Sequence, residues 1–246
     1  MNRLLAAAGG VAATALAVHA APALTSYAPA RRRLLPGLAG SGVSDHVALT
    51  FDDGPDPKST PRFLELLADR KVTATFFFLG YMLSRAPELG REIVDAGHEV
   101  ALHGYTHRCL LFRSPWSTHA DLARGYDTVA EITGRAPVWY RPPYGVLTTS
   151  TLRATKRLGM TPVLWTAWGR DWEAKATPQT VFTTVNDRLA GGGTVLLHDS
   201  DCTSAPGSWR TTLAALPLLA EQLATKDLRV GRLCDHWVAT AGRSSG

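Results

Sequence analysis

The chain has 246 residues, of which 45% are hydrophobic and 19% charged, so it can bury a sizeable core and is neither disordered nor a polytopic membrane protein. Its formal charge of +5 is uneven, because residues 1–40 hold four arginines and no acidic residue, which leaves +1 for residues 41–246. A basic nucleic-acid-binding face is therefore not indicated, and the lack of a repeat of roughly 20–50 residues excludes a solenoid or propeller.

The first residues have the three parts of a secretory signal. Arg3 gives a positive start, a charge-free run rich in Ala and Leu covers residues 4–18, and Ala21-Pro22-Ala23 resembles a cleavage site. The apolar run is short for a membrane span, which needs about 20 residues. We predict that residues 1–23 are a signal peptide or an uncleaved N-terminal signal anchor, and that the protein is secreted or lies on the outer face of the cell membrane. Residues 24–44, rich in Arg, Pro and Gly, are predicted to be a flexible linker.

From residue 46 onward, short β-rich runs alternate with amphipathic stretches. The predicted strands cover residues 47–53, 73–79, 99–104, 138–142, 162–168, 194–198 and 229–233. The predicted helices cover residues 61–70, 84–96, 117–133, 149–158, 178–190 and 209–225. Strands followed by helices indicate parallel βα units. We expect a (β/α)7 barrel over residues 45–238, with an open doubly wound sheet as the alternative, and a disordered tail at residues 239–246.

Ionisable side chains gather where these predicted strands end. In both architectures the carboxyl ends of parallel strands meet at one rim, so these groups are expected to share a site. They are Asp52, Asp53, His103, His107, Arg141, Asp171, His198 and Asp199.

Asp52 and Asp53 precede a Gly-Pro turn that can direct both carboxylates into one cavity. One carboxylate then suits a metal and the other a general base, whereas the alternative is a turn that only caps its loop. His103 and His107 are four residues apart, a weak signal by itself, but two histidines and one aspartate form a three-ligand metal site with positions left open. His198 ends an apolar strand, where an imidazole suits a general acid.

These motifs resemble those of the polysaccharide deacetylase family, also called the NodB homology domain or carbohydrate esterase family 4. The resemblance covers roughly residues 44–235 and follows the family's motif order. It implies a distorted (β/α)7 barrel. It further implies that Asp52 is the base, Asp53 a metal ligand, and His103 and His107 the other two ligands.

The remaining roles also come from the resemblance. Arg141 is expected to orient the base, and Tyr144 to offer its backbone N–H to the oxyanion. Asp171 and Trp172 resemble the end of the fourth motif, with Asp171 placed in the catalytic set. Leu196 and His198 resemble the fifth, in which Leu196 and Trp172 line the acyl pocket and His198 is the acid.

Two positions depart from the family pattern. Gly104 stands where a Ser or Thr hydroxyl usually steadies the metal loop. Trp168 stands where the fourth motif usually begins with Asp, which puts the pKa of His198 in question. All three predicted ligands, the base and the acid are nevertheless present.

The resulting hypothesis is hydrolysis of an N-acyl or O-acyl group on a carbohydrate by water activated at a metal. Zinc is the expected metal, with cobalt or nickel as alternatives. The expected partner is an acetylated glycan, with no nucleic acid, and the protein is expected to be a monomer that meets a membrane only through an uncleaved anchor. Trp116, Trp168 and Trp209 are candidates for stacking on sugar rings.

The three cysteines cannot all pair within one chain. Cys202 and Cys234 follow the last two predicted strands, which are expected to be neighbours, so we predict a Cys202–Cys234 disulfide and a free Cys109.

Two other functions remain open at this point. The first is a cyclic-imide or lipid-linked-sugar deacylase on the same scaffold, with Trp168 reshaping the pocket. The second is a catalytically silent glycan-binding module.

Overall fold

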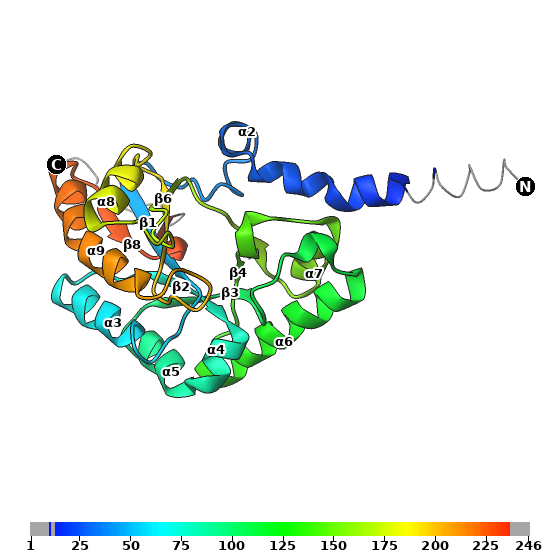
Figure 1. Cartoon of the computed structure of the whole chain (residues 1–246), viewed down its shortest axis with the longest axis horizontal. Helices are drawn as coiled ribbons and strands as arrows, with labels where there is room; N and C mark the ends of the chain where they lie inside the picture. Colours follow the sequence, from blue (N-terminus) through cyan, green and yellow to red (C-terminus); the bar gives the residue numbers. More distant parts are fainter. Residues whose placement is uncertain (1–9, 11–12, 237–246) are drawn as a thin grey trace, which may run out of the picture.

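The computed structural model describes residue 10 and residues 13–236, and Figure 1 shows a single α/β unit in which helices surround a parallel sheet. The predicted tail at residues 239–246 lies outside the described residues. The strands are β1 (His46–Asp52), β2 (Thr75–Leu79), β3 (Glu99–Gly104), β4 (Trp139–Tyr140), β5 (Thr161–Pro162), β6 (Ala167–Trp168), β7 (Thr194–His198) and β8 (Arg229–Gly231).

Helices connect these strands, as the alternating pattern predicts. They are α2 (Ala28–Leu34), α3 (Thr60–Asp69), α4 (Gly80–Arg85), α5 (Pro87–Asp95), α6 (Pro115–Thr133), α7 (Thr149–Arg157), α8 (Pro178–Asn186) and α9 (Ser208–Thr225). Short 3-10 turns occupy η1 (Ala21–Ser26), η2 (Leu110–Phe112), η3 (Pro143–Gly145) and η4 (Leu233–His236). The predicted helix over residues 84–96 is divided, because Pro87 cannot continue α4 and instead begins α5.

The strand order is β5-β4-β3-β2-β1-β7-β6, and β8 pairs with the first half of β1. All described pairs are parallel. The predicted barrel is confirmed, but within the described residues β5 and β6 are not paired, so it is open on one side.

The predicted strand at residues 162–168 is therefore wrong, since the chain forms two short strands with a crossing between them. Other groups bind the backbone of that crossing. Leu38 O accepts from Leu164 N, the Arg141 side chain donates to Leu164 O, and the Arg31 side chain donates to Trp165 O. A backbone whose polar groups are already paired cannot also join a strand ladder.

The segment predicted as a flexible linker packs along this opening instead. The Arg31 side chain is buried, and its guanidinium donates to the carbonyls of Thr25, Ser26 and Trp165. Gly42 N donates to Gly192 O at the start of the barrel. The linker prediction was wrong because composition alone does not reveal that the open side of the barrel needs a cover.

The core has two layers, as expected for strands buried on both faces. Every residue of β1 is buried. Val47, Leu49 and Phe51 pack outward against α3, whereas Ala48 packs inside the barrel against Phe77. By alternation Thr50 and Asp52 share the inner face with Ala48, which puts a carboxylate at the top of the interior.

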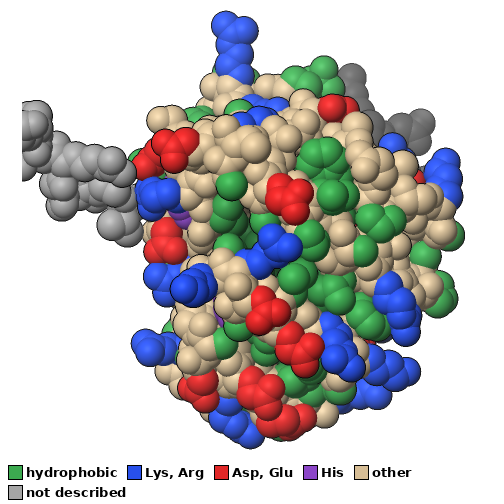
Figure 2. Space-filling model, turned by 90° about the vertical axis from the view of Figure 1, so that its left-hand side faces the viewer, with side chains coloured by type: hydrophobic (Ala, Val, Ile, Leu, Met, Phe, Trp, Pro, Cys, Tyr) green, Lys and Arg blue, Asp and Glu red, His purple; other side chains and the backbone are tan. Residues whose placement is uncertain are grey.

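Figure 2 shows the face that lies on the left of Figure 1, where α3, α8 and α9 are found. Acidic and basic side chains are interspersed on it, so this face offers no continuous basic strip.

Candidate active site

Arg141 binds the side chains at the carboxyl end of β1. Its guanidinium donates to Asp52 Oδ1 at 2.6 Å, to Thr50 Oγ1 at 2.8 Å and to Leu164 O at 3.1 Å, and it stacks on the ring of Phe77 at 3.9 Å. Both charged groups are buried. Burial raises the pKa of Asp52 above its usual value, while Arg141 opposes that rise. The pair therefore holds a carboxylate in a fixed orientation at the floor of the site.

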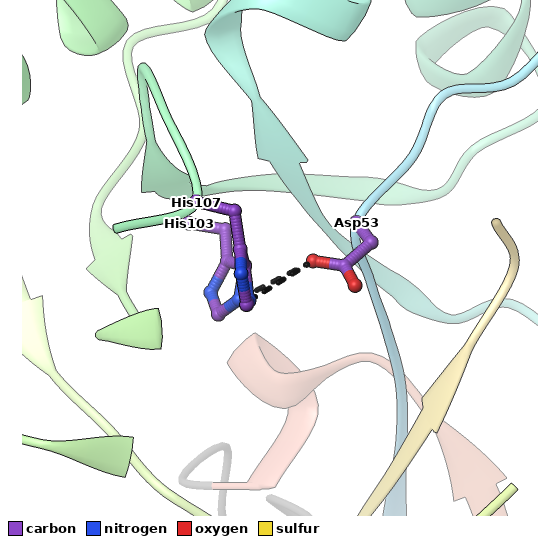
Figure 3. Close-up of side chains that lie close together, drawn as sticks. All are labelled: Asp53, His103 and His107. Atoms are coloured by element: carbon purple, nitrogen blue, oxygen red, sulfur yellow. Dashed lines mark ion pairs between the residues drawn. The ribbon is translucent and has the colours of Figure 1, made fainter. Parts of the chain in front are cut away.

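Asp53 turns back into the same cavity because the chain bends sharply at this point. Its φ is 78°, and a Cβ on Gly54 would lie only 2.4 Å from the Asp199 carboxylate, so glycine is required there. Asp53 Oδ1 lies 3.5 Å from His103 Nε2 and 3.6 Å from His107 Nε2 (Figure 3). Thr203 donates a hydrogen bond to Asp53 Oδ2.

His103 is oriented by its second ring nitrogen. Its Nδ1 lies 2.8 Å from Arg141 O, and because a carbonyl only accepts, Nδ1 carries the proton and Nε2 presents its lone pair toward Asp53. Burial lowers the pKa of His103 to about 3, so the ring is neutral. A neutral imidazole whose outer nitrogen bonds a carbonyl is the usual state of a metal-ligating histidine.

The three side chains fit a divalent metal. Their ligand atoms lie within 4.8 Å of one another. Asp53 Oδ1 is buried and, among the described residues, has no hydrogen-bond partner. A buried, unpartnered carboxylate oxygen beside two imidazole nitrogens is costly without a cation and matches a three-ligand site with open positions.

His198 lies across the cavity from this cluster and is held by Asp171. Its Nδ1 is 3.0 Å from Asp171 Oδ1, and its backbone N–H donates to Asp171 Oδ2 at 2.8 Å. Thr212 donates to the same carboxylate. Burial lowers the pKa of His198, but the Asp171 charge and hydrogen bond outweigh burial and raise that pKa to about 10. The imidazolium is therefore the stable form at neutral pH.

A cavity of about 270 Å³ joins these groups. Asp52, His103, His107 and His198 line its polar side, and the apolar side is formed by Leu196, Pro142, Trp165, Trp168 and Trp172. Tyr144 stands at the rim, 62% exposed, with a φ of 60° and its ring 4.6 Å from that of His107. The structure thus brings together around one cavity all the predicted site residues except the disulfide pair.

Comparison with known proteins agrees with this arrangement. The sequence profile of the polysaccharide deacetylase family matches residues 39–163. A chitooligosaccharide deacetylase of Bradyrhizobium sp. (strain ANU 289) is 34% identical over 192 residues, which is 75% of this chain and 87% of the relative. The chain belongs to the polysaccharide deacetylase family. It is a hydrolase that acts on carbon–nitrogen bonds other than peptide bonds, and a carbohydrate deacetylase.

Solved structures share the fold of this polysaccharide deacetylase. The Bc1960 peptidoglycan N-acetylglucosamine deacetylase is 29% identical, with a TM-score of 0.74 over 82% of this chain and 94% of that one. A second neighbour, from Bacillus anthracis, is 25% identical with a TM-score of 0.71 over 78% of this chain and 65% of that one, and is described as a pseudoenzyme of carbohydrate esterase family 4.

The two departures from the family pattern have structural explanations. Gly104 has a φ of 115°, which side-chain-bearing residues rarely adopt, and Asp121 on α6 holds the metal loop in place of a hydroxyl at position 104. Asp121 accepts from the backbone N–H of Tyr105 and of Thr106 and from the Thr106 hydroxyl. Trp168 lines the cavity, while Asp171 supplies the carboxylate that holds His198.

Three functional-site residues were missed from the sequence, namely Asp121, Trp165 and Thr203. Asp121 lies within a long helix, and only the packing of α6 beside β3 brings it to the loop. Thr203 follows His198 in a polar loop with no motif of its own. Trp165 lies on the crossing that was predicted to be a strand.

The predicted Cys202–Cys234 disulfide is wrong, since all three cysteines are free. Cys202 follows β7 at the catalytic rim, where its Sγ lies 3.5 Å from Asp53 O. Cys234 follows β8, but β8 pairs only with the start of β1, so Cys234 N donates to the Glu99 side chain at the opposite end of the barrel. Of the predicted stacking tryptophans, Trp168 lines the cavity, Trp116 is exposed in the first turn of α6, and Trp209 packs against the core.

Proposed function

We propose that this polysaccharide deacetylase removes the N-acetyl group from N-acetylglucosamine residues of a cell-surface or extracellular glycan, in a reaction that requires a divalent metal. The observation that carries the proposal is the placement of a buried aspartate and a carboxylate-bound histidine on either side of an Asp-His-His cluster. An acid and a base in distinct environments around one metal-ligand set are what acyl hydrolysis requires.

Asp52 serves as the base. Arg141 opposes the rise in the pKa of Asp52 that burial causes, and Asp52 Oδ2 faces the His103 side of the cavity, 3.8 Å from His103 Nε2. From that position Asp52 accepts a proton from the attacking water.

His198 serves as the acid. Because Nδ1 is bound to Asp171, the proton available to substrate is the one on Nε2. His198 donates that proton to the leaving amine when the carbon–nitrogen bond breaks, and the Asp171 charge keeps the imidazolium available at neutral pH.

Asp53, His103 and His107 would hold the metal. A cation there, which we propose to be zinc, would polarise the acyl oxygen and lower the pKa of water. The backbone N–H of Tyr144 is assigned to the oxyanion, and Leu196 with Trp172 forms the slot for the acyl methyl group.

Substrate and location rest on different observations. The relatives named above act, by name, on chitooligosaccharide and on peptidoglycan N-acetylglucosamine, which supports an N-acetylglucosamine polymer as substrate. Arg3, the apolar run at residues 4–18 and Ala21-Pro22-Ala23 support action outside the cytosol.

The test is release of acetate from N-acetylglucosamine oligomers by the full chain. The protein is first stripped with a chelator and then supplied with zinc, cobalt or nickel. We expect release only after metal is restored, and we expect Asp52→Asn to lower the rate by about 10²–10⁴-fold while metal content stays the same. Asp69→Asn, an exposed carboxylate on α3, is the matched control.

Two results would overturn the proposal. One is acetate release that survives chelation. The other is hydrolysis of cyclic imides with none from N-acetylglucosamine oligomers, which would move the function to the imide deacylase considered above.

A further inference from the structure

The large exposed apolar side chains in the described part of the chain are confined to three stretches of the sequence. Eleven large hydrophobic side chains in the described part of the chain are exposed, and all of them lie within residues 1–44, 100–120 and 132–170. They are Leu16, Val18, Leu24, Tyr27, Leu34, Leu35, Phe112, Trp116, Val138, Tyr144 and Leu152.

The same three stretches contain no acidic residue. They hold twelve of the 26 Lys and Arg residues of the chain and none of its 21 Asp and Glu residues, so the remainder of the chain has an excess of acid. On the face opposite the N-terminal helix (residues 13–20), acidic and basic side chains are mixed (Figure 2). Exposed apolar side chains therefore coincide with an excess of positive charge, of which Arg141 and Arg170 are paired with Asp52 and Glu173 outside these stretches.

Polar contacts bring the three stretches together in space. Thr149 on α7 donates to Val18 O at 2.6 Å, and His19 Nε2 lies 3.2 Å from Leu111 O. Ser26 donates to Gly145 O at 3.0 Å, next to the rim of the catalytic cavity. In Figure 1 the N-terminal helix accordingly runs beside the green segment that contains α7.

The N-terminal helix lacks a cover. Residues 13–18 are helical, uncharged and exposed at every position. An apolar helix is normally buried on at least one side, because removing apolar side chains from water is energetically favourable. No helix among the described residues is long and apolar enough to cross a bilayer.

Residues 108–116, which run through η2 into the first turn of α6, have the side chains of a lipid interface. Phe112 is 85% exposed and Trp116 is 81% exposed. Arg108 and Arg113 flank them, both exposed, and within the described residues neither has an ion-pair partner. Aromatic rings and arginines at one edge suit the boundary between lipid headgroups and acyl chains.

We propose that residues 13–27, residues 108–116 and the start of α7 form a lipid-facing surface that binds an anionic bilayer, with the N-terminal helix retained in the mature protein and lying in the headgroup layer. The surface adjoins the cavity rim at Tyr144 and Gly145, so binding directs the catalytic cavity toward glycan close to the membrane. An anionic polymer explains this surface less well than a bilayer does, because it would pair with the arginines but leave the apolar side chains in water.

The experiment measures binding of the full chain to vesicles of phosphatidylcholine alone and of phosphatidylcholine with an equal share of phosphatidylglycerol. We expect strong binding only to the mixed vesicles, weakened by added salt. Phe112→Ser with Trp116→Ser should reduce affinity about tenfold, and Arg108→Ser with Arg113→Ser should reduce it by a similar factor. Leu16→Ser with Val18→Ser tests the helix in the same way.

The matched control is Arg91→Ser with Lys175→Ser, which removes two exposed cations from the acid-containing part of the chain and should leave binding unchanged. Equal loss in the control and in the Arg108 and Arg113 variant would overturn the proposal, since net charge alone would then explain binding. Binding to polyphosphate but not to vesicles would assign the surface to a polymer. A mature protein that begins near residue 24 when exported would remove the helix and overturn the anchor. None of these readouts depends on deacetylase activity.

Discussion

Asp171 makes two hydrogen bonds to His198. Its Oδ1 lies 3.0 Å from the ring nitrogen Nδ1, and its Oδ2 accepts from the backbone N–H at 2.8 Å. The carboxylate therefore fixes both the position of the histidine and the tautomer of its ring. The carboxylate that holds His198 thus comes from position 171, while position 168 carries a tryptophan that lines the cavity.

Asp171→Asn is expected to move the alkaline limb of the pH–rate profile to lower pH. The Asp171 charge favours the imidazolium and raises the pKa of His198 from 6.5 to about 10, so its removal makes the acid lose its proton sooner as pH rises. We expect a shift of about one to two pH units in kcat/KM for acetate release. Because the pKa of His198 is higher in the folded state, the Asp171–His198 pair contributes its full stability below pH 6.5, and that contribution is lost as pH rises toward 10.

Glu173→Gln is the control for Asp171→Asn. Glu173 is two residues away but pairs with the exposed Arg170 and does not contact His198. An alkaline limb that stays in place in Asp171→Asn would show that His198 is not the acid.

Asp121→Ala is expected to weaken metal binding without touching a ligand. The Asp121 carboxylate accepts three hydrogen bonds from Tyr105 and Thr106, and these bonds set the loop that carries His107. Loss of such an outer contact typically costs about 10–100-fold in metal affinity. Competition with a chromophoric chelator measures the change in Kd for zinc.

Asp127→Ala, on an exposed turn of the same helix, controls for the loss of a carboxylate from α6. Equal zinc affinity in the two variants would assign Asp121 a role in folding alone. Recovery of affinity in Asp121→Glu would support positioning.

The alternation of strands and helices along the chain and the identity of the site could be predicted because both depend on local signals. Buried runs such as that of β1 are hydrophobic at nearly every position, and charged residues at their ends are conspicuous against them. The errors came from contacts that no local pattern encodes. The crossing at residues 163–166, the packing of Arg31, the support from Asp121 and the separation of Cys202 from Cys234 all depend on which distant backbone or side chain meets a given atom.

Arg31→Gln is expected to destabilise the fold, whereas Arg33→Gln is not. Arg31 is 3% exposed and donates to the carbonyls of Thr25 and Ser26 and, across the open side of the barrel, of Trp165, and burial lowers its pKa to about 10. Arg33 is exposed on the same helix. Loss of the charged hydrogen bonds should reduce the free energy of unfolding by about 2 kcal/mol, measured by urea denaturation. Equal free energies of unfolding in the two variants would show that the Arg31 contacts do not stabilise the fold and that residues 24–44 act as a linker.

His98→Gln is expected to make the protein less sensitive to acid. His98 is buried, its Nδ1 accepts from Ala74 N, and burial lowers its pKa to about 4, so the native ring stays neutral where the unfolded chain binds a proton. The native state therefore loses stability as pH falls from 6.5 toward 4. In the variant the free energy of unfolding should fall less steeply with pH, because about one proton fewer is taken up on unfolding. Urea denaturation at a series of pH values measures that slope. His119→Gln, a half-buried histidine on α6, is the control, and a slope in His98→Gln equal to that of the control would show that another group, such as the buried His46 and His236 pair, carries the acid sensitivity.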